Sequence, residues 1–439
     1  MQNDEKEQKM NSNLKEFIRY TTLNVLGMIG LSGYILADTF FIAKGLGANG
    51  LTALNLAIPI YSFIHGTGLM LGMGGATKYA IFWGQKEHQK SHQVFTNTLY
   101  LTVLSAAVFM FTGSLLSGKI TALLGADGAV FSMTETYLRI ILLFAPAFLL
   151  NEVLICFVRN DNNPKLSMLA MLTGSLSNIL LDYIFIFPLH LGIRGAVLAT
   201  GAAPVISICI LSWHFIRRQN NFHWIKTKIS ASLAGNILSL GLSSLINEAA
   251  SGIVMIAFNM LILSLQGNTG VAAYGVIANL SLVVISIYTG IAQGTQPIIS
   301  RTYGSGDKNS QRQILKYAII TTEFLSVCIY LLFFQMAYPI VSIFNSEKNM
   351  QLQQIAVTGL KLYFTAIPFA GFNIILAMYF AATDHALPAQ VISLARGLFL
   401  ILPAAVCLSW LIGMSGIWLS FPITEIIVTI AGIFLYHRN

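Results

Sequence analysis

The sequence predicts an all-α membrane protein with twelve transmembrane helices in two pseudo-symmetric six-helix lobes. Three observations lead to this fold class. First, only 10% of the 439 residues are charged and 55% are hydrophobic, whereas soluble domains carry about 25% charged residues. Second, apolar stretches of at least about 18 residues, long enough to cross a bilayer, recur along the chain. Third, motifs of the first half return in the second half.

Twelve apolar stretches are the expected membrane spans, since about 20 helical residues cross the hydrocarbon core. They cover residues 17–44, 51–80, 92–117, 135–158, 166–188, 193–216, 233–265, 270–300, 312–340, 356–380, 388–410 and 413–436. The polar segment 1–16 is expected to be a cytoplasmic tail, and it lacks the features of a cleavable signal peptide. We expect an N-lobe of residues 17–216, a basic linker of residues 217–232 and a C-lobe of residues 233–439.

The distribution of basic residues predicts the orientation. Of the 25 Lys and Arg residues, 19 fall in the tail and in the connections on the same side of the membrane, and six fall on the other side. The positive-inside rule therefore predicts that both termini are cytoplasmic. The net charge of +8 is a topological signal, so we expect no nucleic-acid partner. We expect a multi-pass protein of a bacterial plasma membrane, surrounded by membrane lipids.

An internal repeat supports the two-lobe plan. The motif Gly68-x3-Gly72-x11-Gly84 returns as Gly290-x3-Gly294-x11-Gly306, 222 residues later. The segment 191–198 returns at 412–419 with an offset of 221, and Pro146 matches Pro368 with an offset of 222. Two halves with the same topology imply a pseudo-two-fold axis along the membrane normal, with a substrate path at the interface of the halves.

The polar chemistry of an enzyme is missing from the sequence. The four cysteines all lie in apolar stretches without paired spacing, which predicts neither disulfides nor a metal cage. We find no Walker-type phosphate loop, no nucleophile motif and no metal-spaced His/Cys set. The sequence therefore predicts a protein that is not an enzyme and needs no cofactor. The Gly-rich segment 66–75 lies inside a span and indicates close helix packing or a hinge.

Acidic residues inside the spans are the candidate functional residues. On insertion scales a central Asp costs about 2.5–3.5 kcal/mol, and intramembrane acids are usually retained for a function. The embedded acids are Asp38, Glu152, Asp182, Glu248, Glu323 and Glu425. Glu323 lies near the cytoplasmic end of its span, where it can reach the interface by snorkelling.

Asp38, Asp182 and Thr200 are expected at a common depth, roughly 10 Å below the outer surface at 1.5 Å of helix rise per residue. Asn178 shares a helix face with Asp182, and Ala196 shares one with Thr200, because each pair is four residues apart. Carboxylate, amide and hydroxyl oxygens of this kind suit a proton or a hard cation such as Na⁺. The alternative is that these side chains make helix-packing hydrogen bonds, worth about 0.6 kcal/mol each.

Glu248, His65 and Glu152 are the candidates for contact with a substrate. Glu248 lies in the middle of its span, and His65 could equally be a packing histidine. The 15 Met and 28 Phe residues suit an adaptable apolar binding surface as well as the core. In the second half the positions near the repeat equivalents of the acids are apolar: Phe399, Leu400, Pro403 and Phe421. We therefore expect cation coupling in the first half only.

The chain resembles the multidrug and toxic compound extrusion (MATE) family over nearly its whole length. The resemblance is carried by Asp38-Thr39-x2-Ile42-x4-Gly47, by the Gly-rich end of span 2, by Asn178-x2-Leu181-Asp182 and by Gly195-Ala196-x3-Thr200. It implies outward antiport of amphipathic, mostly cationic drugs against inward Na⁺ or H⁺. It also implies that Asp38, Asn178, Asp182, Ala196 and Thr200 form the cation site, that Glu248 resembles a seventh-span glutamate, and that the protein is a monomer.

Two other functions are compatible with parts of the sequence. A flippase for a lipid-linked precursor would share the two-lobe plan, but its cavity would need more Lys and Arg to meet pyrophosphate. A polytopic membrane enzyme would need a clustered catalytic set, and a channel would be expected to repeat its selectivity element in both halves. The acid-bearing positions differ between the halves of this chain, which favours the antiporter.

Overall fold

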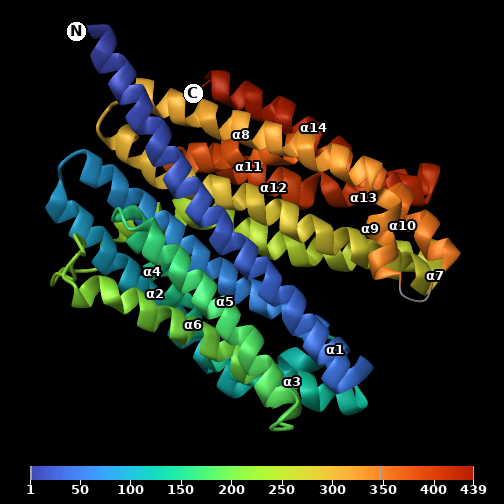
Figure 1. Ribbon diagram of the computed structural model, residues 1–439. Helices are drawn as coiled ribbons and strands as arrows, with labels where there is room; N and C mark the ends of the chain where they lie inside the picture. Colours follow the sequence, from blue (N-terminus) through green and yellow to red (C-terminus); the bar gives the residue numbers. More distant parts are fainter. Residues whose placement is uncertain (1, 346–347, 439) are drawn as a thin grey trace.

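A computed structural model of the protein describes residues 2–345 and 348–438, which form helices and connecting turns without a strand. Figure 1 shows the helices running roughly alongside one another in two groups. The helices are α1 (Gln2–Gly84), α2 (His88–Leu123), α3 (Gly128–Leu143), α4 (Ala145–Asn160), α5 (Pro164–Ile186), α6 (Gly192–Ile216), α7 (Ala231–Gly304), α8 (Lys308–Gln335), α9 (Ala337–Phe344), α10 (Met350–Tyr363), the 3-10 turn η1 (Phe364–Ala366), α11 (Ile367–Ala382), α12 (Ala386–Leu394), the π-helical turn η2 (Ala395–Phe399), α13 (Ile401–Ile412) and α14 (Met414–Arg438).

Twelve membrane crossings follow from these helices. Within the described residues, nine helical segments are long and apolar enough to cross a membrane, and the bent pair of α3 and α4 makes a tenth. Helices α1 and α7 each contain two crossings, divided by Gly47 (φ 67°, ψ −160°) and Gly267 (φ 61°, ψ −157°). Only glycine adopts such backbone angles freely. The short loops expected after residues 44 and 265 are therefore reduced to single glycine turns.

The helix boundaries of the first half return in the second half. For one pair of segments, however, the offset between equivalent residues differs from the offset predicted from the sequence. Helices α1 and α7 end at Gly84 and Gly304, and Glu87 and Asp307 precede the next helices, all at an offset of 220. The match of Gly84 to Gly306 at an offset of 222 is therefore wrong by two residues. Gly306, with φ of 74°, occupies the turn position of Lys86, with φ of 63°. Helix ends fix a register more strictly than glycines inside a helix, which pack at several spacings.

Further along each half, equivalent prolines are separated by the predicted offset of 222 residues. Pro146 lies at the start of α4 and Pro368 at the start of α11, and both follow a break in the helix. The first break bends α3 against α4 by 48°. Proline breaks a helix here because it lacks an N–H and its ring clashes with the preceding turn. Gly192 (φ 62°), the first residue of α6, and Gly413 (φ 60°), the residue before α14, keep the offset of 221.

Each half has its own apolar core. One core contains buried residues between Ile42 and Ile237, and a second contains residues between Phe258 and Trp418. A smaller cluster joins Phe17 and Tyr20 of α1 to residues of α7, α8 and α11. The beginning of α1 therefore packs against the other half of the molecule.

The two halves touch at one end of the molecule and separate at the other. We call the end that carries both termini the terminal side and the opposite end the far side (Figure 1). On the terminal side, a methyl group added at Gly74 or Gly241 would collide with the backbone of Ile237 or Met70 in the opposite half. On the far side, the two groups of helices diverge (Figure 1), and Gly275 has no atom within 4 Å of the same position.

The expected tail is not a separate element, because residues 2–16 continue α1 without a break. From this extension Lys9 contacts Asp307 at 2.7 Å and Glu16 contacts Arg301 at 2.7 Å. Nearby, burial opposes ionisation of Asp307, but hydrogen bonds from Lys9 and Ser310 lower its pKa. The extension thus docks the start of α1 onto α7 and α8.

Candidate functional site

Asp38 of α1 and Asp182 of α5 meet inside the first half of the molecule. Their carboxyl groups lie in hydrogen-bonding contact, and the residues are 7% and 0% exposed. Oδ1 of each carboxyl is buried and has no hydrogen-bond partner among the described residues. Two carboxylates this close repel each other strongly unless a proton or a cation lies between them. We call these two groups the carboxyl pair.

Small residues on α1 allow the pair to form. The face of α1 that meets α5 carries Gly27, Gly30 and Gly45, and a methyl group at any of them would collide with a side chain of α5. The two helices can therefore approach closely. The same face carries Tyr34, one turn before Asp38.

The polar neighbours of the pair are those expected, with one difference in their roles. The hydrogen-bonding network fits when the Asn178 side-chain nitrogen donates to Asp182 Oδ2 (3.1 Å) and its oxygen accepts from the Thr200 backbone N–H (3.2 Å). The amide oxygen is therefore already engaged, and Asn178 positions Asp182. The Thr200 hydroxyl donates to the Ala196 carbonyl at 3.0 Å. All three residues are buried.

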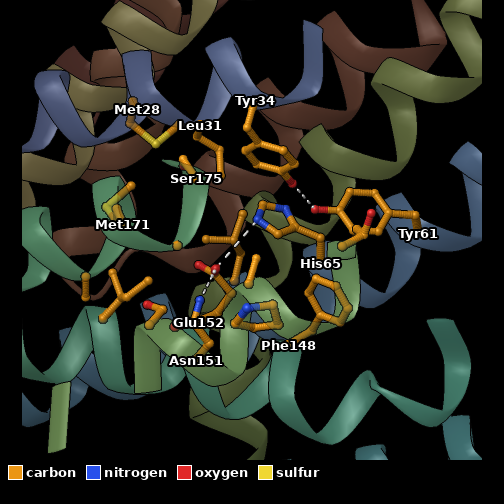
Figure 2. A pocket seen from close by; sticks show the side chains of 18 of the residues that line it. Met28, Leu31, Tyr34, Tyr61, His65, Phe148, Asn151, Glu152, Met171 and Ser175 are labelled. Carbon is orange, nitrogen blue, oxygen red and sulfur yellow. Dashed lines mark hydrogen bonds and ion pairs between the residues drawn. The ribbon is translucent and has the colours of Figure 1, made fainter. Parts of the chain in front are cut away.

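Tyrosines complete the surroundings of the pair, and sequence reasoning missed them. Tyr137 of α3 is 2% exposed, and its hydroxyl hydrogen-bonds with Thr200. The Tyr34 and Tyr61 hydroxyls are 2.6 Å apart, and Figure 2 shows them pointing toward each other. The four-residue spacing of Tyr34 and Asp38 would have allowed Tyr34 to be predicted as a neighbour of the pair. Tyr137 could not be predicted, because it comes from a helix whose rotation the sequence does not specify.

A polar cavity lies beside the tyrosines, between the two halves. This central cavity has a volume of about 60 Å³. The residues of α1, α4, α5 and α6 form most of its wall, and Glu248 and Gln293 of α7 complete it. Among the described residues that line it there is no Lys or Arg. The cavity has room for only a few water molecules, and it is smaller than the roughly 300–1,000 Å³ of drug-binding pockets.

His65 lies between two carboxylates that come from different halves of the molecule. Its Nε2 is 3.7 Å from Glu152 Oε1 of α4, and its Nδ1 is 3.5 Å from Glu248 Oε2 of α7. Figure 2 shows the imidazole directed at Glu152. Glu152 also accepts from the Asn151 amide at 3.3 Å. The structure therefore brings together Glu248, His65 and Glu152.

Two arginines that the charge distribution assigned to surface connections instead make polar contacts inside the protein. Arg159 is 0% exposed and donates to Asn24 Oδ1 (2.7 Å) and Gln293 Oε1 (3.1 Å). Arg396 lies in η2 and contacts Glu425 at 2.7 Å. These two residues are therefore no signal of a cytoplasmic loop. The charge asymmetry of the other connections does not depend on them.

Two six-helix halves around a polar cavity, with a buried carboxyl pair in one half, define a class of protein, the two-lobe membrane transporters. The MatE family model matches residues 25–184 and 244–406. The chain therefore belongs to the MatE family, as its motifs predict, and it is a multi-pass membrane transporter and not an enzyme.

Known relatives agree in length and in fold. The multidrug export protein MepA of Staphylococcus saprophyticus is 24% identical over 425 residues, covering 96% of this chain and 93% of that protein. MepA of Staphylococcus haemolyticus is 25% identical with the same coverage. A crystal structure of a MATE protein in complex with MaL6 gives a TM-score of 0.91 at 23% identity, covering 97% of this chain and 96% of that chain. An outward-facing multidrug resistance MATE transporter gives 0.91 at 22%, covering 97% and 95%.

Proposed function

We propose that this protein is a multidrug efflux antiporter, which exports amphipathic, mostly cationic organic compounds in exchange for inward Na⁺ or H⁺. The observation that carries the proposal is the contact between Asp38 and Asp182 in a dry part of one lobe. Two carboxyl oxygens without a partner there suit a proton or a sodium ion. Multidrug export, the function for which the MepA relatives are named, supports the kind of cargo.

The pair couples ion binding to helix position. With a proton or Na⁺ between them, Asp38 and Asp182 hold α1 and α5 together. Without it, their repulsion favours an arrangement in which the helices part. Coupling requires that these two arrangements bind the drug with different affinities. Asn178, Ala196 and Thr200 fix the position of Asp182 and of α6, so we assign them to the same site.

Glu248, Glu152 and His65 are proposed to receive the cationic part of the drug. A protonated His65 is an internal cation that occupies both carboxylates, so a drug cation must displace its charge. Loss of the proton from His65 frees both carboxylates, so drug affinity should rise as the pH is raised. Replacement of His65 by Gln should abolish this pH dependence, as measured by equilibrium binding of ethidium to the purified protein.

The absence of Lys and Arg from the central cavity wall argues against the flippase alternative, because a pyrophosphate would meet no permanently charged cation there. The small cavity volume means that drug entry requires the lobes to part further. We propose that the lobes 17–216 and 233–439 move as rigid bodies joined by the linker 217–232.

We further propose that the protein is a monomer in a bacterial plasma membrane, with the terminal side facing the cytoplasm.

The coupling ion is decided by one experiment. Ethidium transport by the protein in liposomes would be driven either by a sodium gradient at equal pH or by a pH gradient without sodium. We expect one of the two gradients to drive ethidium against its own gradient. Transport that runs only down the ethidium gradient, under both conditions, would rule out antiport.

A further inference from the structure

A second cavity, separate from the central one, lies on the terminal side and is basic. It has a volume of about 270 Å³ and is formed by α1, α2, the end of the linker and the first turns of α7. Three lysines line it: Lys78 of α1, Lys90 of α2 and Lys228 of the linker. We call it the basic pocket.

The charges around the basic pocket do not cancel. Lys78 pairs with Asp384 at 2.7 Å and Lys90 pairs with Glu87 at 2.7 Å. Lys228 is exposed and has no ion-pair partner within the part of the chain that the structure describes. Three ammonium groups thus face two carboxylates, which leaves a net positive charge. Neither carboxylate is among the residues that line the pocket, and those residues include no acid.

The remaining groups of the pocket are suited to anions as well. Ser230, the N-cap of α7, and Ser232 in its first turn line the wall. The first N–H groups of a helix have no acceptor within the helix, and its dipole favours negative charge at this end. Gln93, Asn97 and Asn236 add amide groups. The Asn97 oxygen already accepts from the Ser230 N–H at 3.0 Å, which fixes the helix start against α2.

The linker beside the pocket has the character of a membrane-surface segment. Trp224 is 58% exposed and Ile229 is 63% exposed, while Phe222 anchors the linker in the core with 0% exposure. Aromatic and basic residues together are typical of segments at the lipid headgroups of a cytoplasmic leaflet. An occupant of the pocket can therefore reach it from the membrane surface.

We propose that the basic pocket binds the phosphate of an anionic lipid headgroup. The walls belong to both sides of the interface, since Lys78 and Lys90 come from the first half and Ser232 and Asn236 come from α7. A headgroup that contacts both walls favours the arrangement in which the halves touch on the terminal side. This inference is independent of the proposed antiport, because it concerns neither the carboxyl pair nor the central cavity.

Lipid binding by the purified full-length protein tests the proposal. Phosphatidylglycerol would be titrated into the protein in neutral detergent, with binding of the first lipid followed by native mass spectrometry. The double variant Lys90→Gln/Lys228→Gln should bind this lipid more weakly, by about fivefold for each lysine removed. The double variant Lys90→Arg/Lys228→Arg keeps the charges and should bind as the wild type does.

The control variant is Lys165→Gln/Lys316→Gln, which removes two exposed lysines of the same side that lie outside the pocket. It should bind phosphatidylglycerol as the wild type does. Equal weakening in both Gln variants would overturn the proposal, because general surface charge would then explain binding. Full competition by an equal concentration of inorganic phosphate would overturn the assignment to a lipid.

Discussion

Glu425 and Arg396 form a buried ion pair in the second half of the molecule, with side chains 1% and 11% exposed. Asn373 donates to the same carboxylate at 2.7 Å. By the repeat offsets of 221 and 222, Glu425 corresponds to Pro204, while Arg396 and Asn373 correspond to Gly174 and Asn151. All three positions of the first half line the central cavity. Where the first half leaves space, the second half therefore carries an ion pair. It also holds the π-helical turn η2 against α14.

Replacement of Glu425 by Gln is expected to destabilise the protein by about 3–5 kcal/mol, because Arg396 would remain buried without a counter-charge. The midpoint of thermal unfolding in detergent measures this effect. The double variant Arg396→Met/Glu425→Met removes both charges and should unfold near the wild-type temperature. Unfolding of the single variant at the wild-type temperature would contradict this account of the pair.

The contact between Asp38 and Asp182 could be anticipated from the sequence, whereas their neighbours could not. Counting residues along each helix gives the depth of a side chain, and a four-residue spacing gives a shared face. Depth alone placed the two acids at one level. The rotation of α3 about its axis and the pairing of Arg396 with Glu425 depend on helix packing, which a single sequence does not specify. Whether the pair is the cation site stays a prediction.

At the scale of elements, glycines decide how closely the helices approach. Where α1 crosses α7, Gly74 of α1 packs against the backbone of α7 and Gly241 of α7 packs against the backbone of α1. A methyl group at either position would collide with that backbone. The Gly-rich stretch in span 2 was expected to pack closely, and this expectation is confirmed. Its repeat register was misjudged, because several glycines in each half allow more than one alignment. The helix breaks at Pro146 and Pro368 could be predicted from the sequence, because proline interrupts a helix.

Gly241→Ala is expected to push the two halves apart on the terminal side, because its methyl group would meet the Met70 carbonyl. Spin labels at positions 165 and 316, in a background without the native cysteines, would report a longer distance between the halves. Gly252→Ala is the matched control, since it lies on the same helix and faces open space. An unchanged distance distribution in Gly241→Ala would contradict the close crossing.

At the scale of the whole molecule, polar contacts across the interface hold the terminal side closed. Lys78 pairs with Asp384, Gln296 donates to Thr77 at 3.0 Å, and Asn24 donates to the Gly290 carbonyl at 3.0 Å. All of them must break for this side to open. The sequence predicted the two halves and their twelve crossings, but not which side is closed, because both arrangements use the same helices.

Asp384→Asn should favour opening of the terminal side, because Lys78 loses its partner in the other half. A cysteine introduced at Thr77, which is 2% exposed, should then react faster with a water-soluble maleimide. Glu87→Gln removes an ion pair of the same length within one half and should leave that rate unchanged. Equal rates in Asp384→Asn and the wild type would show that this pair does not hold the halves together.

The central claim of this account is that Asp38 and Asp182 together bind the ion that drives export. The most direct test is ethidium export against its gradient in liposomes by Asp38→Asn, with the exposed Asp127→Asn as control. We predict that Asp38→Asn abolishes uphill export under both the sodium and the pH gradient, while the purified variant still binds ethidium. Asp127→Asn should export as the wild type does. Uphill export by Asp38→Asn at the wild-type rate would contradict the claim.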